Sequence, residues 1–374
     1  MRYPEFLHDN GTIGFVAPSF GCSTEPYISL FNNAQEHFKA LGYKMKLGPN
    51  AYAGEGIGIS NKPHLCGKEL NEAYTDNEID AIISCGGGEL MCEVVPFMDF
   101  DLVKKSTPKW YMGYSDNTNF TFLSATIADT AAIYGPCVSS FGMEPWHSSV
   151  QDALDLITGR NLVSHGYDMW EGPALPVLDE NGDPIVEENT APDRAELREE
   201  NPLEPYKPNR KTEYKFFVPD GSGLELKLDD TDSTITLEGR LLGGCMDCLV
   251  NLRGTEFDHV DDFNERYKED GIIWFIESCD LNVMSIRRAI WQMKCTGWFK
   301  YVKGFMIGRP LCFGEEMMGL DQYNAVTDLL AEYQVPVLMD LDIGHLPPMM
   351  PLITGAYAKV TAKGNTISVE HILK

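Results

Sequence analysis

Short apolar runs alternate with helix-like segments in both halves of the chain, and this alternation constrains the fold more than any other sequence feature. In the first half, strands are expected at 12–18, 43–47, 79–85 and 110–114. Helices are expected between and after them, at 27–41, 68–74 and 117–128. Strands that alternate with helices predict a parallel sheet covered by helices. The chain is therefore expected to be an α/β protein.

The same pattern resumes in the last third of the chain. Strands are expected at 272–276, 301–307 and 335–339, and helices at 284–293 and 323–333. Two further strands, 357–360 and 366–369, flank Lys363-Gly364-Asn365 and are typical of a closing β-hairpin. With 374 residues, the chain is long enough for two domains of ordinary size.

The segment 166–232 differs from both of its flanks, because it is rich in Pro, Asp, Glu and Asn. Its part 179–210 contains five prolines. Such a composition is typical of a linker or a long surface insertion rather than of a core element. A loop of this length in an enzyme often forms a lid over a site. A solvated linker explains the composition equally well, so both interpretations stay open.

The chain carries 56 acidic and 30 basic residues, which gives a net charge of -26. A surface this acidic repels phosphate backbones and anionic lipids, and this argues against nucleic-acid and membrane-surface binding. Residues 1–10 lack the apolar core of a signal peptide, and no apolar run approaches the roughly 20 residues that span a bilayer. These features predict a cytoplasmic protein with no nucleic-acid or membrane partner.

Ten cysteines are scattered along the chain, several of them within apolar runs. In a large cytosolic protein such residues are usually buried free thiols. Cys245 and Cys248 have the spacing of a zinc or redox pair, but no second pair follows at the spacing of a zinc site. No metal is expected.

The segment 110–118, Trp-Tyr-Met-Gly-Tyr-Ser-Asp-Asn-Thr, is the most informative one for chemistry. An apolar strand enters a sharp turn after Gly113 and a helix follows, so the turn is expected to expose Ser115 at the edge of the sheet. The helix N-terminus beyond the turn stabilises nearby negative charge. Ser115 is therefore a candidate nucleophile, although a serine at this place also suits a helix N-cap.

A serine nucleophile needs a base, and the base needs an orienting partner. Among the eight histidines, His345 is the best candidate, since it lies on a proline-flanked loop after an expected strand. Glu277 ends the apolar strand 272–276, where an acid is either paired with a cation or functional. Glu277 is the candidate partner of His345, and a salt bridge to Arg287 or Arg288 is the alternative.

The glycines Gly86, Gly87 and Gly88 end a predicted strand and let backbone N–H groups approach a ligand closely. We expect them to contact the substrate, with the N–H groups of Gly87 and Asp116 forming an oxyanion hole. A phosphate loop fits the sequence poorly, because no Gly-Lys-Ser/Thr follows and Glu89 has the wrong charge. No cofactor is expected, because the later glycine-rich segment lacks the strand–turn–helix context of a dinucleotide site.

Seven motifs occur in a fixed order along the chain. They are Ile13-Gly-Phe-Val-Ala-Pro-Ser19, Ala81-Ile-Ile-Ser-Cys-Gly-Gly-Gly88, Gly113-Tyr-Ser-Asp116, Glu238-Gly-Arg-Leu-Leu-Gly-Gly244, Leu252-Arg-Gly-Thr255, Phe275-Ile-Glu277 and Asp342-Ile-Gly-His345. Each is weak alone, but the ordered set is specific and covers nearly the whole chain. In this set the chain resembles the serine LD-carboxypeptidases and their relatives, the microcin C immunity peptidases.

The resemblance implies a serine carboxypeptidase in which Ser115 is the nucleophile, His345 the general base and Glu277 its partner. It implies that no metal or cofactor is used and that the protein is a homodimer. It also implies an N-terminal Rossmann-like parallel-sheet domain and a C-terminal β-rich α/β domain, with the active site between them. We assign these domains to 1–160 and 239–374, joined by a linker and long insertion at 161–238.

The chain departs from the family pattern at Cys85-Gly-Gly-Gly-Glu89, where LD-carboxypeptidases often carry Arg-Gly-Gly-Tyr-Gly, and at Cys245, where Asn is usual. Its insertion is also longer than in a typical LD-carboxypeptidase. Long insertions are a feature of the immunity branch, where the loop helps to hold an aminoacyl-nucleotide. Aromatic residues of this segment, Trp170 among them, are candidates to stack on such a substrate, and local packing explains them as well.

Two substrate classes follow from the resemblance. One is a murein tetrapeptide, cut before its terminal D-alanine, and the other is a peptidyl- or aminoacyl-nucleotide antibiotic. The insertion slightly favours the second. The alternative to an enzyme is a non-catalytic two-domain protein that binds a small ligand in its cleft, against which the serine turn and the absent signal peptide both argue.

Overall fold

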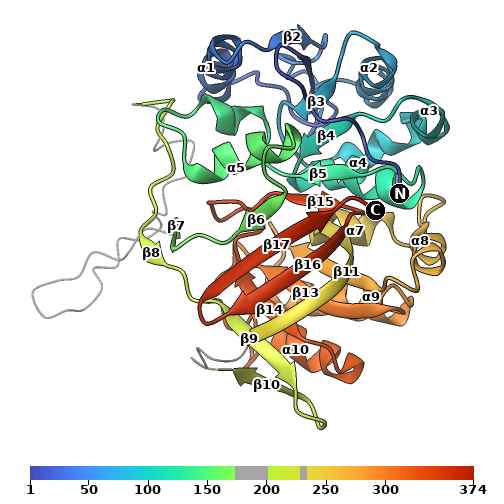
Figure 1. The fold of residues 1–374 in the computed structure, drawn as a ribbon, viewed down its shortest axis with the longest axis vertical. Helices are drawn as coiled ribbons and strands as arrows, with labels where there is room; N and C mark the ends of the chain where they lie inside the picture. Colours follow the sequence, from blue (N-terminus) through green and yellow to red (C-terminus); the bar gives the residue numbers. More distant parts are fainter. Residues whose placement is uncertain (173–200, 228–233) are drawn as a thin grey trace, which may run out of the picture.

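The computed structural model describes residues 1–172, 201–227 and 234–374. Most of its strands belong to two large sheets, the N-terminal one above the C-terminal one in the view of Figure 1. A short pair of strands, β7 (Met169–Trp170) and β8 (Arg210–Lys211), lies apart from both sheets. The prediction of an α/β protein is confirmed.

The N-terminal sheet has six strands in the order β15-β5-β4-β3-β1-β2. They are β1 (Thr12–Val16), β2 (Lys44–Leu47), β3 (Ala81–Ser84), β4 (Trp110–Gly113), β5 (Ala132–Tyr134) and β15 (Leu352–Thr354). β1 to β5 are parallel, as predicted, whereas β15 comes from near the C-terminus and pairs antiparallel with β5. The last part of the chain therefore completes the first sheet.

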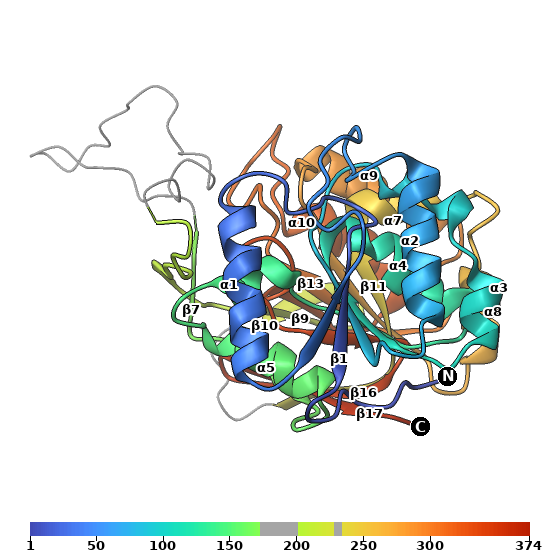
Figure 2. The same cartoon turned by 90° about the horizontal axis from the view of Figure 1, so that it is seen from above.

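Helices cover both faces of the N-terminal sheet (Figure 2). They are α1 (Tyr27–Ala40), α2 (Pro63–Thr75), α3 (Phe100–Lys105), α4 (Thr118–Thr126) and α5 (Ser148–Ile157). α1 and α5 pack on one face, where Phe31 shares a core with Ile83. α2, α3 and α4 pack on the other face, where Phe120 shares a core with Ile82. Neighbouring strand residues point to opposite faces of a sheet, so Ile82 and Ile83 pack in different cores.

The C-terminal sheet has nine strands in the order β10-β9-β14-β13-β12-β11-β16-β17-β6. They are β6 (Val163–His165), β9 (Lys215–Pro219), β10 (Leu224–Lys227), β11 (Thr234–Cys245), β12 (Ile272–Glu277), β13 (Val302–Gly308), β14 (Val337–Leu341), β16 (Tyr357–Lys363) and β17 (Thr366–Ile372). β11 to β14 are parallel and the flanking strands are antiparallel.

One hydrophobic core joins the two parts of the molecule. The helices of the second half are α7 (Met246–Leu252), α8 (Val260–Arg266), α9 (Val283–Cys295) and α10 (Asn324–Leu330). Apolar residues of these helices share a cluster with α4 of the first half. The Phe122 ring of α4 stacks on Trp298 at 5.5 Å and lies 6.3 Å from Trp274 of β12. Because this core is continuous, the relative position of the two sheets is fixed by packing.

Part of the middle segment belongs to the C-terminal sheet. β9 pairs with β14, and Phe216 of β9 is 6% exposed in the core of that sheet. The expectation that this segment holds no core element is therefore wrong for Lys215–Pro219, where apolar residues interrupt the polar composition. Residues 173–200, which hold two of the five prolines, lie outside the described residues. The domain boundaries at 160 and 238 stay a prediction.

The ends of several helices differ from their predicted ranges, most of all in α2 and α10. α2 begins at Pro63 rather than at 68, because proline suits the first turn of a helix, where its missing N–H is not needed. The helix expected to reach 333 ends earlier and continues as a 3₁₀ turn, Ala331–Tyr333. Among the residues whose structure is described, no helix is long and apolar enough to cross a membrane.

Candidate active site

Ser115 is the first residue of a 3₁₀ turn, Ser115–Asn117, which follows β4 after Tyr114 and leads into α4. Its φ is 61°, a left-handed backbone that is uncommon for a residue other than glycine. Gly113 makes the turn possible, because a Cβ there would lie 2.7 Å from the Asn117 side chain. Ser115 makes no helix-capping bond, since Tyr114 occupies the cap position of the 3₁₀ turn. The strand–turn–helix arrangement expected from the sequence is present.

His345 and Glu277 complete a chain of contacts that begins at Ser115. The Nε2 atom of His345 lies 2.8 Å from the Ser115 Oγ, and its Nδ1 atom lies 2.9 Å from the Glu277 Oε2. Glu277 ends β12 and is 1% exposed, whereas His345 follows β14 on a loop. The alternative partner Arg287 instead bonds to Asp328 at 3.0 Å. The structure thus brings the three predicted residues together from three separate elements.

The pKa values of this pair shift in opposite directions. Burial disfavours the imidazolium, but the Glu277 charge, with hydrogen bonds to Cys279 and Glu277, outweighs it and raises the pKa of His345 well above its usual value. Burial also disfavours the Glu277 carboxylate, yet the His345 charge and the hydrogen bonds from His345 and Tyr134 hold its pKa below the ordinary value. Both shifts favour a buried ion pair.

Asp116 anchors the turn that carries Ser115. Its carboxylate accepts hydrogen bonds from the Ser19 hydroxyl at 2.6 Å and from the Met91 N–H at 2.8 Å. The side chain is 3% exposed, and burial raises its pKa although these hydrogen bonds oppose the shift. Gly87 also lies against Ser115, because a Cβ at Gly87 would be 3.0 Å from the Ser115 Cβ. The two predicted oxyanion residues therefore flank Ser115.

A pocket of about 590 Å³ opens at Ser115 and His345. Gly86, Gly87 and Gly88 line it, as expected, and so do the carboxylates of Glu89, Asp247 and Asp280. Its described lining contains no lysine or arginine. Burial and the neighbouring Asp280 charge raise the pKa of Glu89. The pocket therefore presents negative rather than positive charge to a ligand.

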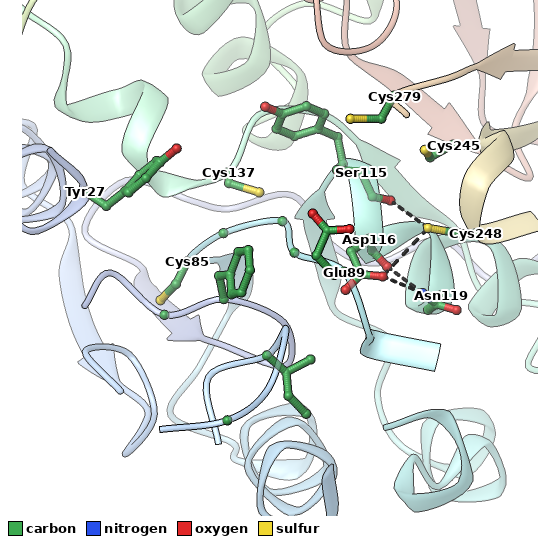
Figure 3. A pocket seen from close by; sticks show the side chains of 18 of the residues that line it. Tyr27, Cys85, Glu89, Ser115, Asp116, Asn119, Cys137, Cys245, Cys248 and Cys279 are labelled. Atoms are coloured by element: carbon green, nitrogen blue, oxygen red, sulfur yellow. Dashed lines mark hydrogen bonds between the residues drawn. The ribbon is translucent and has the colours of Figure 1, made fainter. Parts of the chain in front are cut away.

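Several cysteines lie around Ser115 (Figure 3). The Cys248 thiol lies 3.6 Å from the Ser115 carbonyl oxygen, and Cys245 and Cys279 line the same pocket. A hydrogen bond from Cys245 lowers the pKa of Cys248, but burial and the Asp116 charge, with other nearby acids, outweigh it and raise this pKa to about 11. A thiol of this kind is protonated and poorly nucleophilic. Across the described ranges, no group of three or more His, Cys, Asp or Glu side chains could hold a metal ion.

Trp170 is not among the described residues that line this pocket. It is 3% exposed, and its ring packs 5.0 Å from the Phe313 ring. The guanidinium groups of Arg210 and Arg309 lie over it at 5.4 and 4.9 Å. The structure therefore gives Trp170 a packing role and does not bring it to the triad.

Tyr134 contacts the site although the sequence analysis did not select it. Its hydroxyl donates to Glu277 Oε1 and accepts from the Ser115 N–H at 3.2 Å. The signal that could have found it is its place at the end of β5, the strand next to the one that precedes Ser115.

Both halves of the chain match one family. Residues 13–135 match the LD-carboxypeptidase N-terminal domain and residues 238–360 the LD-carboxypeptidase C-terminal domain of peptidase family S66. The Microcin C7 self-immunity protein MccF of Escherichia coli is 26% identical over 81% of this chain and 77% of its own length. A Bacillus subtilis protein named "Probable murein peptide carboxypeptidase" is 23% identical over 98% and 94%.

MccF is also similar to this chain in its solved structures. MccF in complex with aspartyl sulfamoyl adenosine matches with a TM-score of 0.72 and 22% identity over 99% of both chains. This likeness extends over both sheets and confirms the two-domain α/β fold. The chain therefore belongs to the LD-carboxypeptidases of peptidase family S66.

Proposed function

We propose that this protein is a serine carboxypeptidase that cleaves an amide bond near the carboxyl end of a small peptide or peptide conjugate. The observation that carries the proposal is the continuous contact from the Ser115 hydroxyl through the His345 imidazole to the buried Glu277 carboxylate. This is the arrangement of nucleophile, base and orienting acid that acyl transfer requires. Membership of a family of carboxypeptidases supports the same reaction class.

The reaction proceeds in two steps. Ser115 Oγ attacks the carbonyl carbon while His345 Nε2 takes the hydroxyl proton, and His345 then gives that proton to the leaving amine. His345 then deprotonates a water molecule, whose oxygen adds to the ester carbon. The bond to Ser115 Oγ breaks, the acid product leaves, and His345 returns the proton to Oγ. The N–H groups of Gly87 and Asp116 stabilise the negative oxygen of each tetrahedral intermediate. Glu277 stabilises the imidazolium in both steps.

Two substrate classes suit this site. A murein tetrapeptide would lose its terminal D-alanine, and an aminoacyl-nucleotide would lose its nucleotide part. The name of the Bacillus subtilis relative supports the first class, and the MccF complex with aspartyl sulfamoyl adenosine supports the second. The length of the segment 161–238 favours the second. A homodimer in the cytoplasm is the expected setting for either.

The decisive experiment is a mass-spectrometric cleavage assay of the wild type and Ser115→Ala. A murein L,D-tetrapeptide and a non-hydrolysable-phosphate aminoacyl adenylate analogue would be tested side by side. Loss of D-alanine alone assigns a wall-recycling carboxypeptidase, and cleavage of the adenylate analogue alone assigns a detoxifying peptidase. Ser115→Ala should lose at least about three orders of magnitude in rate. Undiminished turnover by that variant would refute the proposal.

A non-catalytic binding protein is the alternative, since a pocket between two sheets suits ligand capture. Labelling with a fluorophosphonate probe distinguishes the two, because only an activated serine reacts with it. Stoichiometric labelling of the wild type, none of Ser115→Ala and little of His345→Gln would support the enzyme. An unlabelled wild type would support the binding protein.

A further inference from the structure

We propose that Tyr134 is a positioning residue of the site, whose hydroxyl holds the Glu277 carboxylate and the Ser115 backbone in a fixed relation. The inference rests on the proposed function of the Ser115, His345 and Glu277 triad, and adds a fourth residue to it. Tyr134 acts through the triad and is not expected to touch the substrate, because it does not line the described part of the pocket.

The four residues form a closed cycle of hydrogen bonds. The Ser115 N–H donates to the Tyr134 hydroxyl at 3.2 Å, and that hydroxyl donates to Glu277 Oε1 at 2.5 Å. The other oxygen of Glu277 contacts His345 Nδ1 at 2.9 Å, and His345 Nε2 lies 2.8 Å from the Ser115 Oγ. The cycle therefore begins at the backbone of the nucleophile and ends at its hydroxyl. A shift of either Glu277 carboxylate oxygen would therefore change the contacts of both the Ser115 N–H and the Ser115 hydroxyl.

Tyr134 connects the two sheets beside Ser115 and Glu277. Its strand β5 pairs with β4 so that Tyr134 lies opposite Gly113, two residues before the nucleophile. Glu277 ends β12 in the other sheet. The Tyr134 ring is fully buried and lies 5.5 Å from the Phe275 ring of β12. Packing thus fixes the position of the ring. The two hydrogen bonds of its hydroxyl then fix Glu277 and the Ser115 backbone relative to the ring.

The hydroxyl has a specific task at each of its two bonds. Ser115 has a φ of 61°, and a strained backbone persists only where its surroundings hold it in place. The bond from the Ser115 N–H contributes to that restraint. Glu277 is buried as an anion, and each buried carboxylate oxygen needs a donor. Tyr134 supplies the donor for the oxygen that His345 does not reach.

The hydroxyl remains a donor throughout the working pH range. Burial and the neighbouring Glu277 charge raise the pKa of Tyr134 well above its ordinary value, so the phenol stays protonated. Other titratable groups that face the Glu277 and His345 pair include Cys245 on β11, Cys248 on α7, Cys279 after β12, Glu89 on the glycine loop and Tyr114, whose ring lies 5.1 Å from that of His345. A hydrogen bond with Cys248, together with burial, raises the pKa of Cys245, and burial raises that of Cys279, so both thiols stay neutral.

Tyr134→Phe tests the inference, because it removes the hydroxyl and keeps the ring. Since the substrate is not identified, the readout is the rate of fluorophosphonate labelling of Ser115, followed by intact mass over a range of pH. A hydrogen bond to a charged group is strong, so the rate should fall by about 10- to 100-fold. Without its donor the carboxylate becomes more basic and holds the imidazolium more strongly, so the acid limb of the rate profile should move to higher pH.

Tyr74→Phe is the matched control. Tyr74 is 1% exposed on α2, and its hydroxyl accepts a hydrogen bond from the Lys109 N–H, away from the triad. It should leave the labelling rate and the acid limb unchanged. Replacement of Tyr134 by 4-aminophenylalanine restores an N–H donor at the same place and should recover part of the lost rate.

The outcomes separate this inference from the function on which it rests. Labelling of Ser115→Ala as fast as the wild type would refute the triad itself. With that variant inert, a wild-type rate and acid limb in Tyr134→Phe would overturn the role of Tyr134 alone. An equal loss of rate in Tyr74→Phe would also overturn it, because the effect would then come from the loss of any buried hydroxyl.

Discussion

The two sheets hold their reactive groups in different ways. In the N-terminal sheet, Ser115 itself adopts the left-handed backbone, with a φ of 61°. Buried hydrogen bonds through Asp116 and the bond to Tyr134 hold this turn in place. On the C-terminal side of the site, His345 follows Gly344, which has a φ of 107°.

This difference has a physical reason. At the nucleophile, the side chain must be present, so the backbone strain has to be compensated by surrounding bonds. Beside the base, the reactive side chain sits on the next residue, and glycine adopts the left-handed backbone without strain. A Cβ at Gly344 would also lie 2.5 Å from the Glu277 Oε2, so glycine is needed for the close approach of the acid. The left-handed backbone at Ser115 is therefore held by hydrogen bonds, whereas the approach of Glu277 to His345 also depends on close packing at Gly344.

Among the substitutions that test this comparison, Glu277→Gln is expected to lower the activity most. The carboxamide keeps the shape of the side chain but cannot stabilise the imidazolium, so kcat should fall by about 10³- to 10⁴-fold. Steady-state kinetics, with thermal unfolding to show that the variant is folded, would measure this. A variant with more than about a tenth of the wild-type kcat would exclude an essential role for Glu277.

Gly344→Ala should have the next largest effect. The new methyl group meets Glu277 and the residue must keep a φ of 107°, so we expect a loss of about 100-fold in kcat/KM. Gly87→Ala is the matched variant in the N-terminal sheet, where the added Cβ would lie 3.0 Å from Ser115. If close packing restrains the acid–base pair alone, Gly87→Ala should cost clearly less. Equal losses in kcat/KM would contradict the comparison.

The pH dependence follows from the raised pKa of His345. The imidazole must be neutral to accept the Ser115 proton, so kcat/KM should rise with pH, about tenfold per unit on the acid side. Because the Glu277 charge raises this pKa, the acid limb should lie above the usual pKa of histidine. A stopped-assay profile from acid to alkaline pH would measure it. An acid limb at or below the usual value would be inconsistent with the buried ion pair.

The same shift has a consequence for stability. A group whose pKa is higher in the folded state stabilises the fold fully below its unfolded pKa, and this contribution is lost as pH rises through the folded pKa. The stability difference between the wild type and His345→Gln should therefore decrease as pH rises above the usual pKa of histidine. Chemical denaturation at several pH values would measure it, and a difference that grows with pH would contradict the ion pair.

Glu89→Gln should have the smallest effect, and this effect should be a change in the preference for charged substrates. Glu89 is exposed at the pocket and adds negative charge where the described lining has no lysine or arginine. The variant should raise kcat/KM about two- to fivefold for a peptide with an acidic residue beside the cleaved bond, and less at high salt. Glu93→Gln is the control, since Glu93 is exposed but does not line the described part of the pocket. A loss of rate with acidic substrates would contradict this role.

The sequence predicted many of the strands and helices because their signals are local, although it did not indicate β5, β11, α5, α7 or α8. The runs around Ile82 and Ile273 are apolar and short, and both form buried strands. By contrast, β9 was missed because its apolar residues stand in a polar, proline-rich segment, and only pairing with β14 makes them core. For Trp170 the sequence left substrate stacking and local packing open, and the structure buries its ring against Phe313.

The sequence by itself determined the α/β class, the serine turn and the identity of Glu277 and His345 as candidates. Each depends on a pattern that is readable over a few neighbouring residues. Only the tertiary structure decided the closed cycle through Tyr134, since its contact with Glu277 joins residues 143 positions apart in different sheets. It also decided the acidic character of the pocket, because Glu89, Asp247 and Asp280 come from three separate segments. Distances between such side chains depend on how the sheets pack, and no local pattern encodes them.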